Sequence, residues 1–210
     1  MRPLASNVLF VFVAIGLLSA QPVSLGVLGG IPLVDQTNGN DESRPYIVGP
    51  SLEVRLPAGF AIEADALYQR VGNTSSFALI ESFIGSGVAI TTGETTRTRA
   101  NEWEFPVLGK YYFRRNSALQ PFVGTGWALR FADVHETGTE TTADASGASS
   151  TFAFKNDFRS DLEAGASFVA GVRYCIGHFA ILPQVRYTLW GGQNNILNKN
   201  QAAVALGISF

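Results

Sequence analysis

The sequence predicts an all-β fold in which eight antiparallel strands, connected up and down, close into a transmembrane barrel. Segments with strand-like alternation recur along the chain, and the connections between them alternate between short and long. Only 15% of the 210 residues are charged, below the quarter that is usual for soluble proteins, while 22 are glycine. Mean hydropathy is only +0.15, and no apolar run beyond the N-terminus is long enough for a membrane-spanning helix.

The first twenty residues read as a secretory signal peptide. Arg2 supplies the positive charge, residues 8–18 form the apolar core, and Ser19-Ala20 is a small-residue exit, so we expect cleavage after Ala20. The rival interpretation, a single helical anchor, is disfavoured because the apolar core is short and strand-like alternation follows at once. No cysteine stands at the cleavage point, so no lipoprotein anchor is expected. Residues 21–210 are expected to form one exported barrel domain.

Eight segments of that domain alternate with a period of two, as half-buried strands do. Their approximate limits are 22–34, 45–57, 59–71, 100–115, 119–133, 160–175, 178–190 and 201–210. Tight turns are expected at 57–59, 116–118 and 176–177. Longer polar connections are expected at 35–44, 72–99, 134–159 and 191–200. This strict alternation of short and long is typical of membrane barrels with short periplasmic turns and long extracellular loops.

The alternation also assigns each strand two faces. Between 102 and 113, the odd positions carry Trp103, Phe105 and Val107, whereas all the charged residues, Glu102, Glu104 and Lys110, fall on even positions. The other segments repeat this division. Aromatic residues gather near the strand ends, where a membrane barrel has its interfacial girdles. The predicted outer girdle comprises Tyr46, Tyr68, Trp103, Phe131 and Tyr187; the predicted periplasmic one comprises Phe60, Phe113, Tyr174, Phe179 and Phe210.

A soluble lipocalin-like barrel would alternate in the same way, with apolar residues inside. Three features favour the membrane barrel. The polar face is rich in Gly, Ala and Ser rather than densely charged, the aromatic residues lie at strand ends, and the loops alternate in length.

The mature chain resembles the small eight-stranded bacterial outer-membrane barrels, of the OmpA-like and OmpX-like kind. The matching stretches are 23–30 (VSLGVLGG), 121–126 (PFVGTG), 183–187 (PQVRY) and the terminal Phe210. The resemblance implies outer-membrane localisation, contact of lipopolysaccharide with the outer girdle, and insertion by the barrel-assembly machinery through Phe210. We expect a monomer without a C-terminal periplasmic domain, so peptidoglycan binding is not implied. The net charge of −2 gives no electrostatic footprint for nucleic acid.

Eight strands enclose an interior just wide enough for side chains, so the lumen is expected to be filled rather than open. Buried charges need partners, which predicts a plug of salt bridges. A gate that rearranges to pass ions is the alternative. The predicted lumen charge network balances six acids against six bases: Glu53, Arg55, Glu63, Asp65, Glu102, Glu104, Lys110, Arg114, Arg130, Glu163, Arg173 and Arg186.

We expect no enzymatic activity, cofactor or metal. His135, beside Asp133 and Glu136, is the one conceivable acid–base site at the outer rim. His178 falls at a short turn without the following serine of the lipid deacylases and phospholipases. A single cysteine, Cys175, excludes an internal disulfide.

Two of the long connections differ in composition. Residues 136–151 contain Thr, Ser, Ala and Gly and predict a mobile surface loop. Residues 77–80, 83–84 and 88–90 make the 72–99 connection partly apolar, so it extends a hairpin or forms a short helix over the barrel mouth. The function that fits best is a non-enzymatic envelope protein with a structural or surface-interaction role. The alternatives are a narrow channel for ions or small apolar solutes and, less favoured, a lipid A-modifying enzyme at the rim.

Overall fold

The computed structural model describes residues 23–33, 40–41, 46–82, 89–144, 146, 148–192 and 197–210. The expected signal peptide and cleavage site therefore lie outside the described residues, as do Phe83, Ile84 and Val88 of the second long connection. None of the described residues forms a helix long and apolar enough to cross a membrane.

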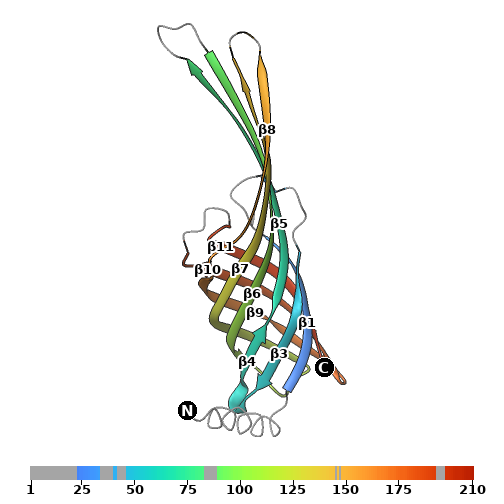
Figure 1. Cartoon of the computed structure of the whole chain (residues 1–210). Helices are drawn as coiled ribbons and strands as arrows, with labels where there is room; N and C mark the ends of the chain where they lie inside the picture. Colours follow the sequence, from blue (N-terminus) through green and yellow to red (C-terminus); the bar gives the residue numbers. More distant parts are fainter. Residues whose placement is uncertain are drawn as a thin grey trace, which may run out of the picture.

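The described strands close into a ring of eight. The strands are β1 (Val23–Pro32), β3 (Ile47–Arg55), β4 (Phe60–Asp65) with its continuation β5 (Leu67–Ser82), β6 (Ala89–Tyr112), β7 (Leu119–Ala143), β8 (Ser149–Arg159) with its continuation β9 (Glu163–Ile176), β10 (Phe179–Trp190) and β11 (Asn200–Ser209). Each pairs antiparallel with the next, and β1 pairs with β11 to close the barrel (Figure 1). A two-residue strand, β2 (Asn40–Asp41), pairs with β5. The predicted all-β, eight-stranded, up-and-down architecture is confirmed.

The strand that contains β4 and β5 is interrupted at Ala66, and two prolines explain the interruption. The register places Ala66 opposite Pro50 of β3 and places its neighbour Asp65 opposite Pro106 of β6. Proline has no N–H to donate to a ladder, so the hydrogen bonding is incomplete on both sides here. The register is the same above and below Ala66, and the strand therefore continues without a bulge.

The short connections lie at one end of the barrel, as predicted. Residues 57–59 form a single 3-10 turn, η1 (Pro57–Gly59), in which Ala58 and Gly59 have φ values of 61° and 90°. Gly177, between β9 and β10, has a φ of 60°. Glycine adopts this region at little cost, which allows β9 and β10 to reverse within two residues.

The exterior of the ring is apolar and the interior polar, which excludes the lipocalin-like alternative. In β10 the outward Val185 and Tyr187 are exposed, whereas the inward Gln184 and Arg186 are buried. Trp127 of β7 is 78% exposed on the outside. The assignment of faces from the alternation is confirmed for every segment in which it was made, except at Arg114. Such a surface satisfies its backbone through the closed ring and meets lipid with apolar side chains.

Aromatic rings encircle part of the outer rim. Ring centroids lie 6.4 Å apart for Tyr46 and Tyr68, 5.3 Å for Tyr68 and Trp103, and 6.1 Å for Phe105 and Phe131. At the other rim, Tyr111 contacts Phe60 at 5.2 Å. These pairs lie where the predicted girdles lie. We call the aromatic residues of the outer rim on β5, β6 and β7 the outer girdle: Tyr68, Trp103, Phe105 and Phe131.

Two of the predicted loops are strands instead. The ladders of β5, β6, β7 and β8 continue above the ring as a four-stranded sheet, which rises from one side of the barrel (Figure 1). We call residues 71–82, 89–100, 134–143 and 149–159 the extracellular sheet. The prediction of a mobile loop at 136–151 is wrong, because strand structure runs to Ala143 and resumes at Ser149. Of the two forms expected for 72–99, the described residues adopt the extended hairpin.

The threonine content explains why these segments form strands. Thr137, Thr139 and Thr141 alternate along β7, and Thr is β-branched, so it favours extended backbone even where no apolar residue is buried. The barrel below also fixes the register of each pair, which removes much of the entropic cost of pairing.

Candidate functional site

The lumen holds most of the predicted charge network. Ten of the twelve residues are buried, Arg55 is partly exposed and Arg114 is exposed. The interior side chains divide into two groups by height. The lower network surrounds Glu53 and Glu63, and the upper network surrounds Arg130.

Two glutamates hold the lower network together. Glu63 accepts hydrogen bonds from Lys110 and, at 2.6 Å, from Nη2 of Arg186, which also lies 2.6 Å from Asp65. Glu53 accepts a bond from Nη1 of Arg173 at 3.1 Å and one from the hydroxyl of Tyr112. Lys110 lies 3.6 Å from Glu53 and so joins the two glutamates. The network thus links β3, β4, β6, β9 and β10 across the lumen.

The upper network is centred on one guanidinium. Arg130 donates to Glu163 through Nε at 2.7 Å, and its Nη1 lies 3.7 Å from Glu102. Its guanidinium carbon lies 4.4 Å from the centre of the Trp190 ring. Gln201 accepts a bond from the Trp190 indole at 2.7 Å and donates to Glu102 at 3.3 Å. Arginine suits this position because it can bind a carboxylate and stack on an aromatic ring together.

Two details differ from the predicted network. Arg114 is exposed in the turn after β6, where its φ is 55°, so it does not enter the lumen. β6 ends at Tyr112, three residues before the limit of 115 that the alternation suggested. The buried groups are therefore unbalanced, with six carboxylates and four cations, and Arg55 at the rim reaches Glu53 at 3.3 Å. Glu104 receives a bond from Thr188 at 3.4 Å.

Neutral side chains that the charge pattern did not single out complete the network. Tyr112, Thr188 and Gln201 each donate to a predicted charged residue, whereas Trp190 donates to Gln201 and packs its ring against the Arg130 guanidinium. All four occupy inward positions of their strands. The alternation of inward and outward residues along each strand could therefore have identified them from the sequence.

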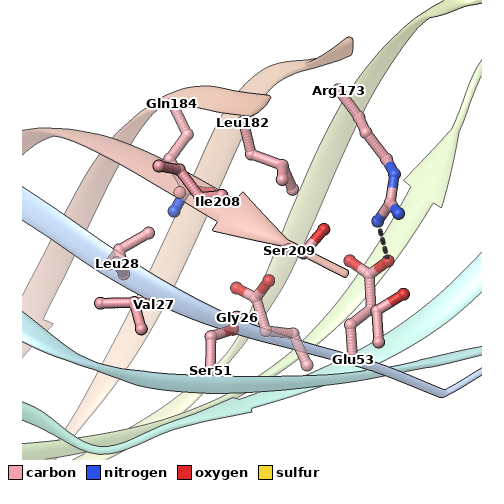
Figure 2. Close-up of a pocket in the computed structure, with 13 residues that line it drawn as sticks. Gly26, Val27, Leu28, Ser51, Glu53, Arg173, Leu182, Gln184, Ile208 and Ser209 are labelled. Carbon is pink, nitrogen blue, oxygen red and sulfur yellow. Dashed lines mark hydrogen bonds and ion pairs between the residues drawn. The ribbon is translucent and has the colours of Figure 1, made fainter. Parts of the chain in front are cut away.

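Small cavities remain between these side chains. One lies where β1 meets β11, beside the Arg173–Glu53 pair, with Gln184 and Ser209 on its wall (Figure 2). A second lies higher and is lined by residues that include Glu104, Arg186 and Gln201. Each has about 20 Å³ of room for the centre of a water molecule, enough for roughly one water.

The extracellular sheet is the second candidate site. The lumen-facing side of β5–β8 continues upward as its inner face, and the lipid-facing side continues as its outer face. The inner face exposes Phe77, Leu79, Phe152 and Phe158. The register places Phe77, Glu94, Glu140 and Phe152 in one row across the four strands.

The outer face carries ion pairs exposed to solvent. Arg159 donates to Asp133 at 2.7 Å, and this bond lowers the pKa of the Asp133 carboxyl. Nδ1 of His135 lies 2.7 Å from Asp157, and Lys155 lies 3.0 Å from the same carboxylate. The bond to His135, followed by that to Lys155, lowers the pKa of Asp157. His135 therefore pairs with Asp157, not with the Asp133 and Glu136 that flank it in sequence.

The remaining predicted residues lie at the periplasmic end. Phe210 is exposed, and its backbone N–H donates to Leu25 at 2.9 Å, so the last residue is held on β1. His178 is exposed in the turn between β9 and β10, and Cys175 is a free, partly buried thiol. Among the described residues, no group of three or more His, Cys, Asp or Glu side chains is arranged to hold a metal ion.

Comparison with known proteins identifies the architecture. The model of a family described as outer membrane protein beta-barrel domain matches residues 19–198. The structure resembles Neisserial surface protein A with a TM-score of 0.51 and 14% identity, covering 89% of this chain and 95% of that one. At this identity the likeness shows the fold alone.

Two further solved structures are similar. The N-terminal β-barrel domain of Pseudomonas aeruginosa OprF is 12% identical with a TM-score of 0.47, covering 90% of this chain and 96% of that one. The attachment invasion locus protein Ail of Yersinia pestis is 12% identical with a TM-score of 0.42, covering 90% and 95%. No curated protein matches the chain.

Proposed function

The chain belongs to the outer membrane protein β-barrel domain family, and from this premise we propose that it is a non-enzymatic surface protein of the bacterial outer membrane. In this proposal the barrel anchors the extracellular sheet, and the inner face of that sheet contacts a partner outside the cell. The localisation in the outer membrane follows from membership of this family.

One observation carries the proposal: the inner face exposes large apolar side chains well above the membrane. Phe77 and Phe152 are 57% and 66% exposed, at the two ends of the row that Glu94 and Glu140 complete. Apolar groups that face lipid need no partner, but these lie above the outer girdle on the side that faces away from lipid. Exposed apolar patches of this kind are typical of contact surfaces.

Attachment measurements test this role. Cells that produce the chain are compared with cells producing the Phe77→Ser/Phe152→Ser variant for attachment to protein-coated surfaces and to one another. We expect the variant to attach less. The Thr139→Ser/Ala153→Ser variant, altered on the outer face, is the control and keeps full attachment. Equal attachment by all three chains, at equal surface levels, contradicts the proposal.

The lumen supports a structural role for the charge network. The Lys110, Arg130, Arg173 and Arg186 side chains fill the interior, and every one of them contacts a buried carboxylate. We propose that these pairs form a plug. The two water-sized cavities favour one alternative, a narrow channel for ions, which single-channel recordings distinguish.

The proposed partners in the envelope are lipid, lipopolysaccharide and the barrel-assembly machinery, with Phe210 as the assembly signal and the protein as a monomer. The exposure of Phe210 at the end of β11 is consistent with recognition of an unpaired terminal strand before the barrel closes. A Phe210→Ser variant that reaches the outer membrane at the normal level would contradict this role.

A further inference from the structure

The carboxylates of the extracellular sheet have ion-pair partners on one face only. On the outer face, both carboxylates are paired with cationic side chains. On the inner face, Glu94, Glu136 and Glu140 form no ion pair with any described residue, and the described side chains of this face include no cation. The inner face therefore leaves these three carboxylates without a neutralising partner.

Two of the three carboxylates lie directly opposite each other. The strand register pairs Glu94 of β6 with Glu140 of β7. Side chains in such positions have Cβ atoms about 5 Å apart, and like charges there oppose the pairing of the strands. Glu94 accepts a hydrogen bond from Thr96 at 2.7 Å, but no described cation relieves the repulsion. A cation from outside the chain that lies between the two carboxylates is attracted by both and stabilises the sheet.

Aromatic rings surround this pair of carboxylates. Phe77 and Phe152 are exposed at the two ends of the same row. In the next row down, the ring of Phe154 extends over Gly138, where a Cβ atom would lie 2.2 Å from it. Gly138 is the inner-face neighbour of Glu140 on β7. A cation bound at Glu140 is therefore close to the ring of Phe154, and aromatic rings attract cations.

The chain itself covers the base of the inner face but leaves this row open. Leu197 is buried in a cluster with Val71, Ala100 and Val134, which form the lowest inner row of the extracellular sheet. The row that contains Phe77 lies three inner rows higher and is exposed. The same face thus packs against an apolar side chain at its base and presents an uncovered apolar surface above.

We propose, on the basis of the contact role given above for the inner face, that its partner is an extended polypeptide segment with an arginine between two apolar side chains. Four strands about 4.8 Å apart place the ends of the row about 14 Å apart, and alternate residues of an extended chain are about 7 Å apart. An apolar–x–Arg–x–apolar pattern therefore spans the row. The apolar side chains lie on Phe77 and Phe152, and the guanidinium lies between the two carboxylates.

Arginine fits this position better than other side chains. Its planar guanidinium donates to carboxylates on two sides and stacks on aromatic rings, whereas a lysine ammonium is a compact charge that is more strongly hydrated. The carboxylates and the rings occur together on the inner face, so one arginine contacts both.

Binding of a fluorescently labelled synthetic peptide to the refolded full-length chain in uncharged detergent tests the proposal. The peptide repeats Leu-Ser-Arg-Ser, which places leucine and arginine alternately on one side of an extended chain. The reference peptide has citrulline in place of arginine, so its shape is kept and its charge removed. We expect the citrulline peptide to bind about fivefold more weakly or less tightly still. Equal binding of the two peptides overturns the role of the cation, and binding of neither overturns the proposal.

Variants of the chain locate the site. Glu94→Gln/Glu140→Gln removes both charges, keeps a hydrogen-bond acceptor for Thr96, and should weaken binding of the arginine peptide about fivefold or more. The matched control is Asp157→Asn/Asp161→Asn, which removes two exposed carboxylates that lie off the inner face and should leave the affinity unchanged. An equal loss in both variants, or a loss in neither, overturns the proposal.

Heat-modifiable migration shows whether each variant is folded. If the glutamine variant is not folded, the two peptides and the salt dependence of the unmodified chain decide. Binding of the arginine peptide that does not weaken as salt rises overturns the proposal.

Two further measurements separate this partner from other occupants of the face. Cells that produce the glutamine variant keep every apolar side chain of the inner face. If they attach normally while the Phe77→Ser/Phe152→Ser cells do not, the contact role stands and the arginine-containing partner is overturned. Sedimentation of the unmodified chain without peptide detects a second copy, and we expect a monomer. A dimer that the glutamine variant does not form assigns the face to self-association and overturns the proposal.

Discussion

Lys110 lies in the middle of the lower lumen network. Its side chain is fully buried, it contacts both Glu63 and Glu53, and its ammonium lies 4.6 Å from the centre of the Phe122 ring. Removing one partner of a buried ion pair leaves the other charge uncompensated in a medium of low polarity, which costs more than the pair itself contributes.

We therefore expect Lys110→Met to lower the free energy of unfolding by about 3 kcal/mol. Urea titration in detergent, followed by the gel shift between folded and heat-denatured chain, measures this difference. Lys155→Met is the matched control, because Lys155 is paired but 67% exposed, and its loss should cost less than about 1 kcal/mol. Similar losses in the two variants would show that the lumen is more hydrated than the burial of Lys110 indicates.

Among the residues that the structure describes, His135 and Asp157 form the one pair on the outer face that has the composition of an acid–base site. The 2.7 Å contact is present, but both side chains are about half exposed, and among the described residues no hydroxyl is hydrogen-bonded to the imidazole. An imidazole needs such a partner to activate a nucleophile. We expect His135→Ala to leave the structure of lipid A unchanged in mass spectra of whole cells. A modification that disappears in this variant would establish the rim enzyme instead.

At the scale of strands, the backbones of β6 and β7 approach so closely that only glycine fits at position 126, an inward position of β7. A Cβ atom on Gly126 would overlap the carbonyl oxygen of Val107 on β6, whereas one on Gly29 of β1 would meet nothing within 4 Å. We expect Gly126→Ala to destabilise the barrel by about 1–3 kcal/mol and Gly29→Ala to have little effect. The same urea titration compares them. Equal stability would mean that β6 and β7 separate easily at this height.

The sequence predicted the barrel strands well and the extracellular strands poorly, and the reason is physical. Between 102 and 113, lipid on one side and a polar lumen on the other impose a sharp alternation, which the sequence records. Above the girdle both faces meet water, so Thr137 to Thr141 needs no alternation of polarity. Its strand structure depends on β-propensity and on a register inherited from the barrel.

In the lumen, the sequence predicted which residues face inward but not which of them form ion pairs. The alternation along the strands placed Glu63, Lys110 and Arg186 inside, and they are buried together. The alternation could not predict the stagger between neighbouring strands, which determines the ion-pair partners. Arg130 contacts Glu163 and Glu102, whereas Glu104, its partner in the strand register, accepts a hydrogen bond from Thr188. Nor could the alternation show that β6 ends before Arg114. The predicted network therefore contained two more buried cations than the structure does.

The extracellular sheet and the barrel should be separable. Among the described residues, the lumen ion pairs lie below the row of Arg70 and Arg159, and the ring closes without the upper strands. We expect a chain in which 75–96 and 138–154 are each replaced by Asn-Gly to fold and to keep heat-modifiable migration. The new turns join the register partners Thr74 with Arg97 and Thr137 with Lys155. Loss of the folded gel band would show that the upper strands are needed for closure.

At the scale of the whole molecule, the question is whether water and ions can pass from one end to the other. The two cavities are each about the size of one water, and they are lined by different ends of the charge network. Between them lies the contact of Glu63 with Lys110 and Arg186, whose side chains are almost completely buried. An ion that crosses this layer must break at least one buried pair, which costs several kcal/mol.

We expect the full-length chain to give no resolved single-channel current in planar bilayers across a wide range of voltage. The Lys110→Ala/Glu63→Ala variant removes one cation and one carboxylate together, keeps the net charge, and shortens both side chains at the layer between the cavities. If this layer is the barrier, the variant conducts while the unmodified chain does not, and the current favours small ions. A closed variant would place the barrier at the Arg130 layer above, whereas steady current through the unmodified chain would contradict the plug and establish the channel.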